Sequence, residues 1–101
     1  MLAQFSVFPV GSAESLSKDV AKILDIIDNS GLSYQFTAMS TIVEGDWDSV
    51  MALIKKCRDA MRESFGRVYL SITIDDRADA TQRLKGKVES VENILNRKLR
   101  K

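Results

Sequence analysis

The segment TAMSTIVEGDWDSV, residues 37–50, places a carboxylate, Glu44, at the end of a short apolar run and directly before Gly45. A carboxylate in a strand is costly to bury unless a cation or a hydrogen-bonding group pairs with it. A positively charged or amidine-like ligand would be one such partner, and a neighbouring arginine would be another. Glu44 is therefore a candidate ligand-binding residue, with a structural ion pair as the alternative.

Several kinds of chemistry are excluded by the residue types that the chain lacks. It contains no histidine and a single cysteine, Cys57, which excludes Ser–His and Cys–His nucleophile pairs, an intramolecular disulfide and a cysteine-cluster metal site. Glu44 and Asp75 could act as acid and base, but the sequence offers no third group to orient them. Asp75 and Asp76 would point to opposite sides of a strand, so they would not chelate one ion. We therefore expect no enzyme activity, no metal and no cofactor.

The composition is typical of a folded soluble protein. Of the 101 residues, 45% are hydrophobic and 29% are charged, and the formal net charge is +1. These values predict a single domain over residues 1–101 with one packed core. The start of the chain does not resemble a signal peptide, and no apolar run approaches the roughly 20 residues of a membrane span. We expect a cytoplasmic protein with no membrane partner.

Hydrophobic periodicity predicts a mixed α+β fold, in which alternating side chains mark strands and apolar residues at helical spacing mark helices. The predicted elements, in order, are a strand over 2–8, a helix over about 15–30, two short strands within 34–45 joined near Met39 and Ser40, a helix capped by Asp46 and ended by Gly66, a strand over 67–75, and a helix that carries Leu84, Val88, Val91 and Leu95.

This order contains the β-α-β unit twice. Two right-handed β-α-β crossovers in one sheet produce the ferredoxin-like βαββαβ sandwich. We therefore predict an antiparallel sheet of order 4-1-3-2, with the helices on one face and an extra helix at the C-terminus. Because Val20 and Cys57 lie on the apolar stripes of the two main helices, we expect both to face the core, and Cys57 to be unreactive. Trp47, on the stripe of the second helix, is expected to anchor the core or an interface.

Strand alternation also sorts the sheet residues between two faces. The expected hairpin would pair Phe36 with Val43 and Gln35 with Glu44, which places Phe36 and Val43 under the helices. The opposite, helix-free face is then polar with a few rings and has no lysine or arginine within its strands. Such a face is typical of a surface partly covered by another subunit. Its residues are Gln4, Ser6, Phe8, Gln35, Thr37, Ile42, Glu44, Tyr69, Ser71, Thr73 and Asp75.

An ordered set of phrases runs through nearly all of the chain: FSVFPVG, the serines at 15 and 17, MSTIVEGDWDSV, RVYLSITIDDR and KVESV. With these phrases the sequence resembles the small thiamine-binding protein family of the YkoF-like group. The resemblance implies a ferredoxin-like protomer that forms homodimers or homotetramers and binds thiamine, or its hydroxymethylpyrimidine moiety, without chemistry. The chain departs from the family at Ser40, where glycine is usual, and at Thr73, where lysine is usual.

The chemistry of that ligand matches the residues of the helix-free face. An aminopyrimidine offers a ring nitrogen and an exocyclic amine, which one carboxylate such as Glu44 could hold together. Hydroxyl groups could add hydrogen bonds, Phe8 or another ring could stack on the pyrimidine, and a second carboxylate could lie near the cationic thiazolium. The candidate ligand-binding residues are Gln4, Ser6, Thr37, Met39, Thr41, Glu44, Tyr69, Ser71, Thr73 and Asp75.

Two other functions fit the same fold. A ferredoxin-like sheet can bind RNA through rings on its open face, but that mode requires basic neighbours, and here only the basic stretch over 83–101 supplies them. We therefore expect no nucleic-acid partner. An oligomeric regulatory module that senses a small ligand is the other alternative. Serines 12, 15 and 17 could hold a phosphate at a helix N-terminus, although helix capping is the simpler role.

Overall fold

A computed structural model describes residues 1–11, 17–78 and 94 of the chain. The helix predicted around Leu84 to Leu95 lies outside the described residues, apart from position 94. The elements are β1 (Leu2–Pro9), α1 (Ser17–Asp28), β2 (Ser33–Phe36), β3 (Thr41–Glu44), α2 (Trp47–Arg62) and β4 (Val68–Asp75). Neither α1 nor α2 is both long enough and apolar enough to cross a membrane.

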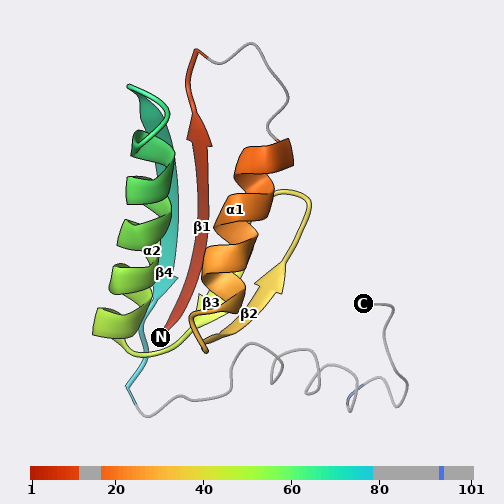
Figure 1. The fold of residues 1–101 in the computed structure, drawn as a ribbon. Helices are drawn as coiled ribbons and strands as arrows, with labels where there is room; N and C mark the ends of the chain where they lie inside the picture. The colour runs from red at the N-terminus through yellow and green to blue at the C-terminus, as the bar shows by residue number, and fades with distance from the viewer. Residues whose placement is uncertain (12–16, 79–93, 95–101) are drawn as a thin grey trace.

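The four strands form one antiparallel sheet in the order β2-β3-β1-β4. Read from the other edge, this is the predicted order 4-1-3-2, so the ferredoxin-like α+β fold is confirmed. Both helices lie on the same side of the sheet, and β1 runs through its middle (Figure 1). The pairing of β1 with β4 extends from Leu2 opposite Asp75 to Pro9 opposite Val68. We call the side of the sheet without α1 and α2 the open face.

The core lies between the sheet and the two helices. Alternation along β1 buries Ala3 and Phe5, and the opposing stripe of α1 contributes Ile23 and Ile27. The apolar stripe of α2 completes the cluster with Val50, Leu53, Ile54, Cys57 and Met61. The expected burial of Cys57 is confirmed, and this burial raises the pKa of its thiol to about 11.

The two residues that follow Glu44, Gly45 and Asp46, lead directly into α2. The Asp46 side chain accepts a hydrogen bond from the Ser49 amide at 3.0 Å, which confirms the predicted N-cap and lowers the pKa of Asp46. A side chain at Gly45 would place its Cβ 3.0 Å from Leu32 Cδ2, so glycine lets β3 pass close to the core. Trp47 does not lie in the core: it is 53% exposed because the buried stripe begins one turn later, at Val50. Its alternative place at an interface stays a prediction.

The predicted hairpin register was also wrong. Phe36 pairs with Thr41 and Tyr34 pairs with Val43, whereas we expected Phe36 opposite Val43. The reason is the turn at residues 37–40, which closes earlier along β2 than expected. A shift of two residues leaves the side chains of β2 and β3 on their predicted faces, but it moves Thr37 out of the strand and into the turn. Phe36 is nevertheless 50% exposed, because β2 is an edge strand.

Replacement of Ile27 tests the position of the core. Ile27 is fully buried, whereas Ile26 on the same helix is only partly buried. We expect Ile27→Ala to lower the free energy of unfolding by about 2–5 kcal/mol, and Ile26→Ala to lower it by about 1 kcal/mol. Denaturant unfolding of both variants measures the difference. Equal losses of unfolding free energy in the two variants would contradict the finding that α1 packs against the core through Ile27.

Candidate ligand-binding site

A hollow of about 260 Å³ opens where β1 ends, α1 begins and the turn between β2 and β3 approaches both. Figure 1 shows this turn beside α1, at the same end of the molecule as the end of β1. Three segments that are distant in the sequence thus meet at one place. The described lining residues are Phe5, Ser6, Val7, Phe8, Pro9, Asp19, Val20, Ile23, Leu24, Phe36, Thr37, Ala38, Met39, Ser40, Thr41 and Met61.

The walls of the hollow are mainly apolar and include two exposed side chains of the turn region. Phe36 is 50% exposed and Met39 is 86% exposed, so both offer surface to a flat ring. Val20 was expected to face the core, but it is 42% exposed and lines the hollow instead. Apolar walls with a few polar groups are the usual construction of a small-molecule site.

The turn from Phe36 to Thr41 is organised by one hydroxyl group. Thr37 Oγ1 accepts hydrogen bonds from the amides of Met39 (3.2 Å) and Ser40 (3.1 Å), and it donates one to the Ser40 carbonyl (2.9 Å). The Thr37 amide donates to the same carbonyl at 2.8 Å. Three bonds use most of the capacity of a hydroxyl. Thr37 therefore holds the turn in place, and its predicted hydrogen bond to a ligand stays a prediction.

Asp19 is the one charged residue among the described lining residues. It lies in the first turn of α1 and is partly buried. No hydrogen bond or ion pair from another described residue engages its carboxylate. The sequence analysis missed Asp19, because an acid near a helix N-terminus is explained by the helix dipole alone. Its position four residues before Ile23, on the same side of the helix, is the signal that could have identified it.

The ten predicted site residues divide into two groups. Ser6, Thr37, Met39 and Thr41 line the hollow, although strand parity places the Ser6 side chain on the open face and Thr41 is 6% exposed on the helix side. The other six lie on the open face: Gln4, Glu44, Tyr69, Ser71, Thr73 and Asp75.

On the open face, the register sets the neighbours of these six residues. Leu2 stands between Glu44 and Asp75, and Gln4 pairs with Thr73 on one side. At the far end, Phe8 pairs with Tyr69, and their rings stack with centroids 5.3 Å apart and planes at 29°. The predicted face is therefore formed, but its carboxylates lie at the opposite end of β1 from the turn that borders the hollow.

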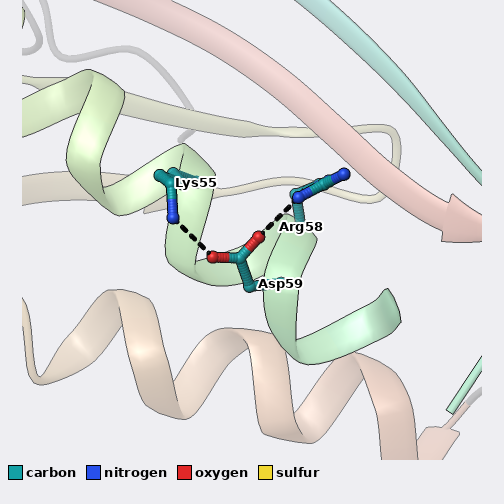
Figure 2. Close-up of polar contacts among 3 residues, drawn as sticks. All are labelled: Lys55, Arg58 and Asp59. Atoms are coloured by element: carbon teal, nitrogen blue, oxygen red, sulfur yellow. Dashed lines mark hydrogen bonds and ion pairs between the residues drawn. The ribbon is translucent and has the colours of Figure 1, made fainter. Parts of the chain in front are cut away.

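A second group of polar residues lies on the surface of α2. Asp59 accepts hydrogen bonds from Lys55 at 2.9 Å and from Arg58 at 2.8 Å (Figure 2), and these bonds lower the pKa of Asp59. Surface pairs of this kind contribute little to stability. Within the described residues, no group of three or more cysteine, aspartate or glutamate side chains could hold a metal ion.

Comparisons with known proteins agree on one family. The sequence profile described as "Thiamine-binding protein" matches residues 3–92. A UPF0045 protein of Mycobacterium bovis is 36% identical over 98 residues, which are 96% of each chain. A UPF0045 protein of Methanothermobacter thermautotrophicus is 36% identical over 96 residues, which are 92% of this chain and 97% of that one.

Solved structures share the fold. A protein of Methanocaldococcus jannaschii matches with a TM-score of 0.80 and 29% identity, over 89% of this chain and 93% of that one. A Thermotoga maritima protein, whose name proposes a part in thiamine biosynthesis or salvage, matches with a TM-score of 0.76 over 89% and 96% of the two chains. At 21% identity, this second likeness shows the fold alone.

The role of Thr37 in the turn can be tested by two substitutions. Thr37→Val keeps the shape of the side chain but leaves two backbone amides without their acceptor, so we expect a loss of about 1–3 kcal/mol in unfolding free energy. Thr37→Ser keeps the hydroxyl and should lose much less. Denaturant unfolding measures both, and amide exchange at Met39 and Ser40 should accelerate only in the valine variant. If the valine variant were as stable as the parent, with amide exchange as slow at Met39 and Ser40, this role would be refuted.

Proposed function

The chain belongs to the thiamine-binding protein family, and we propose that it binds thiamine, or the hydroxymethylpyrimidine half of thiamine, without transforming it. The absence of histidine from the sequence and the burial of the single cysteine support a binding role over a catalytic one. Storage, transport and sensing all require the same property, a selective site.

We place the ligand in the hollow between β1, α1 and the β2–β3 turn. The observation that carries this proposal is the combination of a partly enclosed apolar space with one carboxylate, Asp19. Ligand pockets usually measure about 300–1,000 Å³, so a space of about 260 Å³ suits a small heterocycle. Phe36 and Met39 would contact the faces of the ring. Ser40 could supply a hydrogen bond at the turn.

We further propose that a second copy of the chain covers the open face. Phe8 and Tyr69 are 43% and 55% exposed there and stack on each other. No lysine or arginine stands within the four strands, and the carboxylates of Glu44 and Asp75 lie at the opposite end of the face from the ring pair. The rings of two copies could therefore pack together away from charged groups. The open-face residues predicted to bind the ligand, Glu44 among them, would then line the interface between subunits rather than the ligand site.

Isothermal titration with thiamine and with hydroxymethylpyrimidine tests the ligand and its location. Val20→Trp should fill the hollow and weaken binding of both ligands by at least about tenfold, because Val20 lines the hollow but is not part of the buried core. Val20→Ala is the matched control and should bind nearly as the parent does. The Glu44→Gln variant, which is changed on the open face, should also bind both ligands with nearly the affinity of the parent.

Two outcomes would contradict this proposal in different ways. Loss of binding in Glu44→Gln, with normal binding in Val20→Trp, would move the site to the open face. No binding of either ligand by the parent protein would rule out the thiamine-binding function for this chain.

The subunit interface is tested by the molar mass in solution. Tyr69→Asp would bring a charge into the proposed interface, so light scattering should show a mass half or one quarter of that of the parent assembly. Lys56→Asp introduces the same residue on the exposed surface of α2 and should leave the mass unchanged. A parent protein that is already monomeric, or a Tyr69→Asp variant of undiminished mass, would contradict the proposal.

A further inference from the structure

Resting on the proposed function, we infer that Asp19 makes the site selective for charge. The site would prefer a cationic, unphosphorylated heterocycle such as thiamine over the neutral hydroxymethylpyrimidine and over phosphate esters of thiamine. Asp19 would therefore be a specificity-determining residue that contacts or closely approaches the cationic part of the ligand.

The charges around the hollow support this inference. Asp19 is the one charged residue among the described lining residues, and it is partly buried. Lys22, one turn further along α1, forms an ion pair with Glu63 at 3.4 Å. Lys18 is exposed and does not line the hollow. The described part of the site thus presents a negative charge with no lysine or arginine in its lining.

The N-terminus of α1 has the opposite effect to Asp19, because it attracts anionic ligands. A helix N-terminus carries the equivalent of about half a positive charge and attracts phosphate groups. The carboxylate of Asp19 carries a full negative charge in the first turn of the same helix. At similar distances the full charge dominates, because the Coulomb energy is proportional to the charge. A cation is therefore favoured in the hollow and a phosphate is disfavoured.

The partial exposure of Asp19 limits the size of the effect. A charge pair near the protein surface is weakened by solvent and by salt. We therefore expect a preference of roughly tenfold, which should decline as the salt concentration rises. Binding of the neutral pyrimidine should depend little on salt.

The experiment is calorimetric titration of the full chain and of Asp19→Asn with three probes. These are thiamine (cationic), hydroxymethylpyrimidine (neutral) and thiamine monophosphate (carrying an anionic phosphate). Asp19→Asn should weaken thiamine binding by roughly tenfold, change pyrimidine binding by less than about twofold, and reduce the discrimination against the phosphate ester. Asp25→Asn is the control, because Asp25 lies on the same helix but outside the hollow, where its carboxylate accepts a hydrogen bond from the Asn29 side chain.

The possible results separate this inference from the function on which it rests. Equal weakening of thiamine and pyrimidine binding in Asp19→Asn would mean that Asp19 acts as a hydrogen-bonding or structural group, which overturns charge selection. Tighter binding of the phosphate ester than of thiamine by the parent protein would overturn it as well. No binding of any probe by the parent protein would overturn the proposed function itself, and this inference with it.

Discussion

The structure depends on the central position of β1, which pairs with β3 on one side and with β4 on the other. This pairing commits alternate residues of β1 to opposite faces, so Ala3 and Phe5 are buried under the helices while Gln4 and Phe8 face away. It also fixes where the neighbouring segments begin and end. The turn that joins β2 to β3 follows the pairing of Thr41 with Phe5, so it lies beside the second half of β1, and α1 returns across the sheet next to it (Figure 1). The hollow is a consequence of this convergence.

The two faces of the sheet therefore suit different roles. On the helix side, the packing of α1 and α2 fills most of the space but leaves a gap near Val20 and Met39, bounded by the Thr37 turn. On the open face, the stacked Phe8–Tyr69 pair lies among small polar side chains. A small ligand is best held by the gap, because it can be contacted from several sides there. For a second subunit we propose the open face, because it exposes the rings of Phe8 and Tyr69.

Much of the fold could be predicted because local signals agreed with each other. The alternation in β1 and β4, the Asp46 cap and the stripe from Val50 to Met61 all depend on neighbouring residues in the sequence. The hairpin register could not be predicted, since it depends on three hydrogen bonds to the Thr37 hydroxyl. Periodicity alone does not reveal which hydroxyl will close a turn. Trp47 and Val20 lie outside the core for a related reason: periodicity identifies a stripe but not where the packing against it ends.

The candidate site was harder to predict than the fold. Ser6, Thr37, Met39 and Thr41 were chosen as ligand residues and do line the hollow. Strand parity placed only Ser6 and Thr37 of these on the open face, together with most of the other predicted residues. The i, i+4 spacing of Asp19 and Ile23 places both on one side of α1, but an acid in the first turn of a helix is already explained by the helix dipole. The proximity of Asp19 to Phe36 and Met39 around one cavity arises only when α1 packs beside the hairpin turn. Strand parity can assign a face, but it cannot predict a cavity formed between a helix and a turn.

The most direct test of this account is the amide spectrum of isotope-labelled protein during titration with thiamine. We expect the shifted resonances to cluster at Asp19–Leu24 and at Phe36–Thr41, the segments of α1 and the turn that border the hollow. Shifts concentrated instead at Gln4, Glu44 and Thr73 would place the ligand on the open face and contradict the account.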